Sequence, residues 1–226
     1  MAIPPFCTFF SELRTMTKTL LRTLCAPALL LIVCSSPTWS APPPSNAMVV
    51  EEEWKLVLDT PNTTGDSPQF CTSFSLGSGD YIVTTWNYRT YPDYVEGGIQ
   101  LQVWENGEVV DVTTVDLAEL NVKDDTIRWK HVYRVQGSDV EMKIVGVNSQ
   151  TWGNNINTTS VSKSNANVAN FNLYDPTVSC RESGITLGAN RVEWFGITGV
   201  TVYDEKGRRM AQDATLRPVY TAPSSP

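Results

Sequence analysis

Apolar and polar residues alternate with a period of two along most of the chain between residues 51 and 213. The alternating runs are rich in Val, Ile, Thr and aromatic residues, which is typical of half-buried β-strands, and helical patterns are almost absent. The runs that carry this pattern cover residues 54–60, 81–88, 98–105, 108–115, 126–135, 139–148 and 191–204.

Two short segments between these runs predict hairpins. Asn106 and Gly107 separate residues 98–105 from residues 108–115, and both tolerate the positive φ angles of a two-residue type I′ turn. Residues 136–139 offer a second turn. Short strands joined by tight turns predict an all-β fold, an antiparallel β-sandwich or jelly roll in which two sheets bury their facing sides.

The N-terminal region has the three parts of a secretory signal peptide. Within residues 16–41, Lys18 and Arg22 supply a basic start, an apolar run too short to span a bilayer follows, and small residues end the segment at Ala41. We therefore expect Met16 to be the true start of translation.

The pattern predicts four segments along the chain. Residues 1–41 are the leader, residues 42–50 a Pro-rich linker, residues 51–213 the β-sandwich domain and residues 214–226 a disordered tail. Within the domain, the Asn-, Thr- and Ser-rich residues 153–172 are expected to form a long loop or an irregular edge.

The net charge and the predicted export limit the classes of binding partner that we expect. Three of the 17 basic residues and one of the 24 acidic residues precede residue 42, so the chain carries a net charge of −9 once the leader is removed. An acidic chain does not reward phosphate contacts, so no nucleic-acid partner is expected. No segment after the leader reads as a membrane span. We expect a secreted protein, in the periplasm, at the cell surface or outside the cell.

The cysteines that remain after the leader favour one disulfide. Three of the five cysteines lie in the leader, which leaves Cys71 and Cys180. An even pair in an oxidising compartment favours a Cys71–Cys180 bond. Two buried thiols are the alternative.

Metal sites are weakly indicated. Zinc is not expected, because the chain has one histidine and no Cys-x-x-Cys pair. Calcium could be bound by loop carboxylates with backbone carbonyls, and Asp80, Asp93, Asp175 and Asp204 are the candidates. Isolated surface aspartates in turns explain the same residues, so no cofactor is required.

Two strands carry a resemblance to a known family. The run "VTVYDEKG", residues 200–207, resembles the final strand of concanavalin A-like sandwiches of the laminarinase and LamG type, and "GIQLQVWE", residues 98–105, is similar to an inner strand of the same sandwiches. The resemblance implies a concanavalin A-like β-sandwich. Laminarinase-like enzymes place their carboxylates as Glu-x-Asp-x-x-Glu, whereas Glu51, Glu52 and Glu53 are consecutive here, so that glycosidase activity is not expected.

His131, the one histidine of the chain, marks a second candidate site. On a strand, Trp129, His131 and Tyr133 share one face. Jelly-roll polysaccharide lyases use histidine and tyrosine to abstract and donate protons, so in an enzyme His131 and Tyr133 would be the catalytic residues. The alternative is a core face with a hydrogen-bonded histidine.

Aromatic residues indicate where a ligand could bind. Trp86, Tyr88, Tyr91 and Tyr94 crowd a strand end and turn, and exposed rings there could stack on sugar faces. Trp152 lies in a polar, loop-like stretch and is a second candidate. The alternative is that these rings fill the core and the sheet edge.

These observations favour a non-catalytic, secreted β-sandwich domain whose ligand is a polysaccharide or other glycan. Two alternatives remain from the sequence. One is a polysaccharide-degrading enzyme, a lyase or glycoside hydrolase, and the other is a structural or cell-surface adhesion protein. The oligomeric state is left open.

Overall fold

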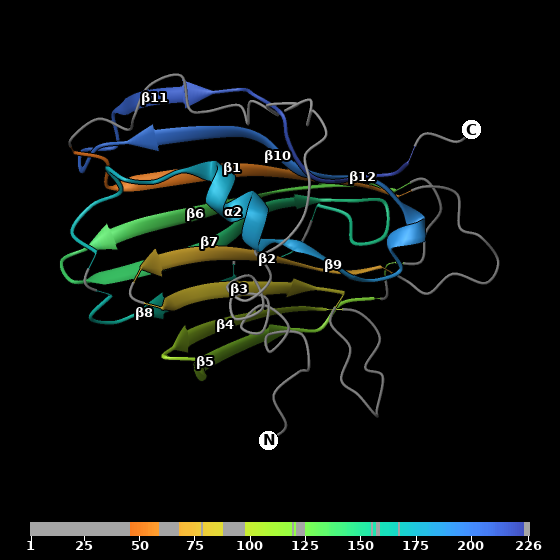
Figure 1. The fold of residues 1–226 in the computed structure, drawn as a ribbon, viewed down its shortest axis with the longest axis horizontal. Helices are drawn as coiled ribbons and strands as arrows, with labels where there is room; N and C mark the ends of the chain where they lie inside the picture. Colours follow the sequence, from red (N-terminus) through yellow and green to blue (C-terminus); the bar gives the residue numbers. More distant parts are fainter. Residues whose placement is uncertain are drawn as a thin grey trace, which may run out of the picture. The chain divides into compact units, whose positions relative to one another are not determined.

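Two antiparallel β-sheets pack face to face as a β-sandwich in the computed structural model of the chain (Figure 1). The all-β fold predicted from the alternation is confirmed. The structure describes residues 46–58, 68–77, 79–87, 98–118, 120, 125–154, 156, 159–166 and 168–223. The predicted leader lies outside these residues.

The larger sheet, sheet A, has seven strands in the order β11-β10-β1-β6-β7-β8, with β12 paired to β10 beside β11. Its strands are β1 (Val49–Leu58), β6 (Thr126–Gln136), β7 (Asp139–Asn148), β8 (Thr159–Lys163), β10 (Val192–Tyr203), β11 (Arg209–Asp213) and β12 (Arg217–Thr221).

The smaller sheet, sheet B, has five strands in the order β5-β4-β3-β2-β9. Its strands are β2 (Gln69–Gly77), β3 (Asp80–Trp86), β4 (Ile99–Glu105), β5 (Glu108–Val115) and β9 (Gly184–Leu187). The segment "GIQLQVWE" supplies β4, which has a neighbouring strand on each side.

Both predicted hairpins are present. Asn106 and Gly107 have φ angles of 50° and 85°, and they join β4 to β5 in antiparallel pairing. Gln136 pairs with Asp139 where β6 turns into β7. The turn residues thus fixed the register of these two hairpins, because a tight turn leaves the paired strands no freedom to slip.

Two segments expected to be irregular contain strands. Residues 153–172 were expected to form a long loop or an irregular edge, and residues 159–163 within them form β8, an edge strand that pairs with β7. Residues 217–221, expected in a disordered tail, form β12 and pair with β10. Arg217 explains the order of β12, since its guanidinium is buried and donates to the Asp213 carboxylate at 2.6 Å.

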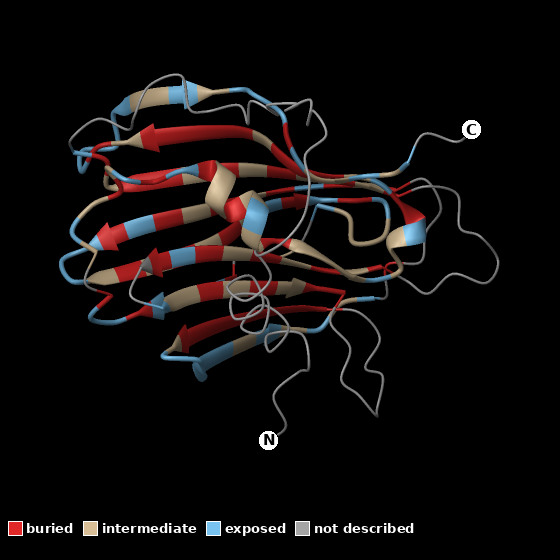
Figure 2. Cartoon of the chain, in the orientation of Figure 1, coloured by how far each residue is buried: buried red, intermediate tan, exposed pale blue. Residues whose placement is uncertain are grey.

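Aromatic side chains from both sheets meet in the core. Trp129 and Phe195 of sheet A contact Phe70 of sheet B, with ring centroids 5.7 Å and 5.1 Å away. Trp86 of sheet B lies 4.4 Å from the Trp129 ring. The alternation of buried and less buried residues along the strands is visible in Figure 2. Burial of such large rings between the sheets is the main stabilising contribution to the fold.

A short helix, α2 (Pro176–Glu182), packs against β2 next to β9. Strand β9 pairs only with Gln69, Phe70 and Cys71, and beyond this point α2 packs against β2 and against β10 and β12. The hydroxyl of Ser183 accepts a hydrogen bond from the Ser73 amide of β2 at 3.1 Å. The helix thus covers part of the inner face of sheet A that sheet B leaves open.

No helix in the part of the chain that the structure describes is long and apolar enough to cross a membrane.

Gly196 on β10 is required by a close backbone approach. A Cβ atom there would overlap the Arg217 carbonyl of β12, whereas a Cβ atom at Gly184 would meet nothing within 4 Å. We expect Gly196→Ala to displace β12 and to lower the free energy of unfolding by about 2 kcal/mol, the usual range for overpacking. Denaturant unfolding measures this, with Gly184→Ala as the matched control; equal stability of the two variants would contradict the pairing of β12.

Candidate functional site

A fully buried glutamate stands on the inner face of sheet A. The alternation of β1 turns Val50, Glu52 and Trp54 toward the core, while Glu51 and Glu53 face outward. Glu52 is directly opposite His131 in the pairing of β1 with β6. A carboxylate buried in an apolar core is costly unless it is hydrogen-bonded, so its partners decide its role.

Neutral groups donate hydrogen bonds to both oxygens of Glu52. The Tyr174 hydroxyl donates to Oε1 at 2.7 Å. The indole Nε1 of Trp54 and the hydroxyl of Tyr133 donate to Oε2 at 2.9 Å and 3.3 Å. The hydroxyl of Ser179, on α2, bonds the same carboxylate. The Glu52 carboxylate therefore accepts hydrogen bonds from side chains of β1, β6 and α2, and so connects these three elements.

His131 has a defined tautomer. The indole Nε1 of Trp129, which can only donate, lies 2.9 Å from Nε2 of His131, so Nε2 must be the acceptor. The proton of the neutral ring is then on Nδ1, which lies 3.2 Å from the Tyr133 hydroxyl and 3.7 Å from Oε2 of Glu52. Trp129, His131 and Tyr133 form a chain of donors that ends on the Glu52 carboxylate.

The burial and the hydrogen bonds shift the pKa values in this cluster. Burial raises the pKa of Glu52, but hydrogen bonds from His131, Tyr174 and Ser179 outweigh it and hold the pKa below 4.5. Burial lowers the pKa of His131 below 6.5, because desolvation disfavours the charged ring. Burial and the Glu52 charge raise the pKa values of Tyr133 and Tyr174. At neutral pH the cluster holds one negative charge, on Glu52.

His131 has the environment of a hydrogen-bonded core histidine, which was the alternative to a catalytic role. His131 and Tyr133 are buried, and both ring nitrogens of His131 are occupied by Trp129 and by Tyr133. The face that they share was predicted correctly. Neither side chain has the solvent access that a general base for a polysaccharide requires.

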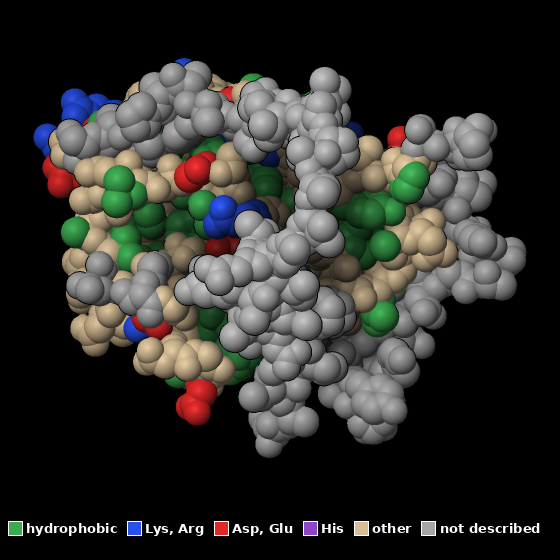
Figure 3. Space-filling view, in the orientation of Figure 1, with side chains coloured by type: hydrophobic (Ala, Val, Ile, Leu, Met, Phe, Trp, Pro, Cys, Tyr) green, Lys and Arg blue, Asp and Glu red, His purple; other side chains and the backbone are tan. Residues whose placement is uncertain are grey.

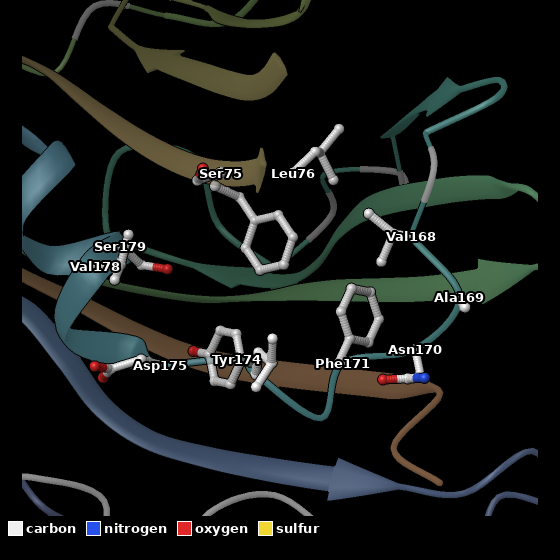
Figure 4. A pocket seen from close by; sticks show the side chains of 12 residues that line it. Ser75, Leu76, Val168, Ala169, Asn170, Phe171, Tyr174, Asp175, Val178 and Ser179 are labelled. Atoms are coloured by element: carbon white, nitrogen blue, oxygen red, sulfur yellow. The ribbon is translucent and has the colours of Figure 1, made fainter. Parts of the chain in front are cut away.

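A cavity of about 400 Å³ lies beside the cluster. It is bounded by the end of β2, by residues 168–175 and by α2, and Tyr174 forms the wall that separates it from Glu52. Figure 3 shows hydrophobic side chains gathered in a hollow beside α2. In Figure 4, Val168, Phe171 and Tyr174 point into the cavity from the segment that precedes α2.

The predicted aromatic ligand site is not formed as expected. Trp86 is fully buried and stacks on Phe70, so the expectation of an exposed ring at Trp86 is wrong. Trp152 is half-buried, and its Nε1 donates to the Ala118 carbonyl at 2.7 Å. The remaining candidates lie outside the residues that the structure describes: Tyr88, Tyr91 and Tyr94.

The outer face of sheet B carries a different set of polar and aromatic side chains. Along β4, Gln100, Gln102 and Trp104 alternate with core residues. The Gln102 amide donates to Gln100 at 2.6 Å, and Nε1 of Trp104 donates to Gln102 at 3.0 Å. Tyr81 of β3 stacks on Trp104 with centroids 5.5 Å apart. The pairing of β3 with β4 also places Thr85 beside Gln100.

The two outer faces of the sandwich differ in charge. Sheet A bears ion pairs on its outer face, such as Lys130 with Glu53 at 2.9 Å and Lys143 with Glu141 at 3.0 Å. On sheet B, the outward positions between the strand ends carry no charge in the described part of the chain. They are Cys71, Ser73, Ser75, Tyr81, Val83, Thr85, Gln100, Gln102, Trp104, Val109, Val112 and Thr114.

The predicted disulfide is absent: Cys71 and Cys180 are not bonded to each other. Cys71 alternates with the buried Phe70 and Thr72, so its side chain lies on the outer face of β2. The Sγ atom of Cys180 instead contacts the Arg217 carbonyl at 3.6 Å. The two thiols therefore face different surroundings.

No group of three or more His, Cys, Asp or Glu side chains that could hold a metal ion occurs in the described ranges. The calcium candidates there have other partners. Asp80 accepts from the Asn106 amide, Asp175 caps α2 by accepting from the Thr177 amide, and Asp204 accepts from Arg208. Asp93 lies outside the described residues.

Two groups of residues were missed from the sequence, although both have a visible signal. Glu52 stands in a period-two pattern with Val50 and Trp54, but it is hidden by the acidic residues on either side. Gln100 and Gln102 alternate with apolar residues in the same way. Tyr174 has no signal of this kind, because it joins the cluster from an irregular segment.

Comparison with known proteins does not identify a family for this chain. No family model matches the chain, and no curated protein matches it. Among solved structures, the crystal structure of scytalido-glutamic peptidase with a transition state analog inhibitor covers 76% of this chain and 83% of its own, with 9% identity and a TM-score of 0.25. Chains that superpose this poorly share no more than a general resemblance, so the comparison indicates no activity.

The hydrogen bonds to Glu52 predict a large loss of stability in Glu52→Gln. The amide would present a donor to a cluster of donors, and we expect the free energy of unfolding to fall by about 3 kcal/mol. Glu53→Gln is the matched control, because the half-exposed Glu53 side chain forms an ion pair with Lys130 on the outer face; it should cost less than about 1 kcal/mol. Equal losses in denaturant unfolding would contradict the role of Glu52.

The buried histidine predicts a loss of stability as pH falls below 6.5. The folded state disfavours protonated His131, which faces Glu52 from β1 and Tyr133 on β6, so protons bind preferentially to the unfolded chain. The free energy of unfolding should fall by up to about 1.4 kcal/mol per pH unit through this window. His131→Gln keeps a hydrogen-bond acceptor and a donor. In this variant the free energy of unfolding should depend less on pH between 6.5 and the lower pH at which carboxylates titrate. An unchanged slope would show that His131 does not cause the pH dependence.

Proposed function

We propose that this protein is a secreted, non-catalytic carbohydrate-binding domain that takes a neutral polysaccharide on the outer face of sheet B. The observation that carries the proposal is that the outward positions of sheet B, among them Gln100, Gln102 and Tyr81, carry no charge in the described part of the chain, whereas the outer face of sheet A is ion-paired. The export signal in the sequence supports a ligand outside the cytoplasm.

The chemistry of this face suits a sugar chain. An aromatic ring packs against the apolar C–H face of a pyranose, and glutamine amides donate to and accept from its hydroxyls. Tyr81 is half-buried and supplies the more accessible ring, with Thr85 and Thr114 at the flanks. The lack of charged residues between the strand ends favours a neutral glycan over a uronate polymer.

The outward side chains of β4 are themselves mostly buried. Gln100 and Gln102 are each 8% exposed and Trp104 is 1% exposed. Tyr81, which is half-buried, is therefore the ring of this face that a ligand would reach first.

A non-catalytic role fits the buried cluster better than an enzymatic one. His131 and Tyr133, the catalytic candidates of the alternative, bond only to core residues in the described structure. An adhesion protein remains the second candidate, because β5 forms one edge of sheet B and exposes Val109, Val110 and Val112. Self-association without affinity for a glycan would favour it.

To test the proposal, the protein without residues 1–41 is incubated with neutral and acidic insoluble polysaccharides. Its retention on each polymer and the release of new sugar ends are measured in the same samples. We expect retention on a neutral polymer without new ends, and Tyr81→Ala should weaken it about tenfold, the usual loss for a stacking ring at a hot spot. Tyr203→Ala is the matched control, since Tyr203 is a half-buried tyrosine on sheet A. New sugar ends, or equal losses in the two variants, would contradict the proposal.

A further inference from the structure

The cavity beside α2 has aromatic walls. Phe74 is a buried residue of β2, and its ring lies 5.8 Å from Phe171 in an edge-to-face arrangement and 5.9 Å from Tyr174 at an interplanar angle of 20°. These rings line a space of about 400 Å³, which is in the range of small-molecule sites. A pocket walled by ring faces presents the negative side of each π-system to its contents.

The charges around the cavity are negative. Asp175 lies at its rim, and the buried carboxylate of Glu52 stands behind the Tyr174 hydroxyl that donates to it. No Lys or Arg is among the residues that line the cavity in the described structure. The field of Glu52 reaches α2, because burial together with this charge raises the pKa of Cys180 to about 12.

The hydrogen bonds to Glu52 in the described part of the chain come from neutral donors. The groups that bond its oxygens are hydroxyls, an indole N–H and a neutral histidine. A cation placed in the cavity would face ring edges and faces on its walls, Asp175 at the entrance and the negative potential of Glu52 through Tyr174. Cation–π attraction is stronger for a cation that has lost part of its hydration shell than for a fully hydrated one.

We infer that this cavity is a binding site for a small organic cation, an ammonium group that carries alkyl substituents. The alkyl groups would contact Leu76, Val168 and Val178, and the charge would lie against Phe171 and Tyr174 (Figure 4). This site is separate from the outer face of sheet B, so it does not depend on the proposed glycan binding.

A pair of probes of equal shape separates charge from apolar contact. Choline carries a quaternary ammonium, and 3,3-dimethylbutan-1-ol places a neutral tert-butyl group in the same position. Calorimetric titration of the purified protein should show choline binding at least about tenfold more tightly than the alcohol. Equal affinities would reduce the cavity to an apolar pocket and overturn the inference, as would the failure of both probes to bind.

Two variants locate the site without a change of fold. Asp175→Asn keeps an N-cap residue for α2 while it removes the rim charge, so choline should bind about threefold more weakly with unchanged stability. Phe171→Leu should weaken choline about tenfold and leave the alcohol nearly unaffected. Tyr220→Leu is the control, because Tyr220 lies on β12 and does not line the cavity. Choline affinity that is unchanged in both Asp175→Asn and Phe171→Leu would place any binding elsewhere.

Discussion

One buried carboxylate organises the interior of this sandwich. Glu52 accepts hydrogen bonds from Trp54 on its own strand, from Tyr133 on β6, and from Tyr174 and Ser179 at α2. Each of these groups would be costly to bury without a partner, and the carboxylate would be costly without them. The cluster therefore fixes where α2 lies over sheet A, at the position where β9 stops and sheet B leaves the inner face uncovered.

The residues around Glu52 resemble an active site in composition but serve the stability of the core. A histidine, two tyrosines and a glutamate within hydrogen-bonding distance invite an assignment as an active site. Trp129 determines otherwise, because an indole that donates to Nε2 of His131 holds the ring in one tautomer and occupies the nitrogen that a base would use. The surfaces that remain for ligands are the uncharged outer face of sheet B and the aromatic cavity behind which Glu52 supplies negative charge.

Much of the fold could be predicted from the sequence, because a period-two pattern and two tight turns determine pairing locally. The strands from β3 to β7 were found this way, and Asn106 and Gly107 adopt the positive φ angles that their hairpin requires. Segments ordered by distant partners were missed. Strand β12 depends on Arg217 and on Gly196 of another strand, and Tyr174 reaches Glu52 across 122 residues. Trp86 was placed on the surface because alternation reports two faces and does not say which is buried.

The most direct test of this account is the protonation state of the one histidine, read from the ¹⁵N and ¹H spectrum of its ring. At pH 6.5 an exposed histidine is half protonated. His131 should instead be neutral, with its proton on Nδ1 and with Nε2 accepting from Trp129. A charged ring, or a proton on Nε2, would contradict the chain of hydrogen bonds that ends on Glu52. His131 would then again be a candidate catalytic residue.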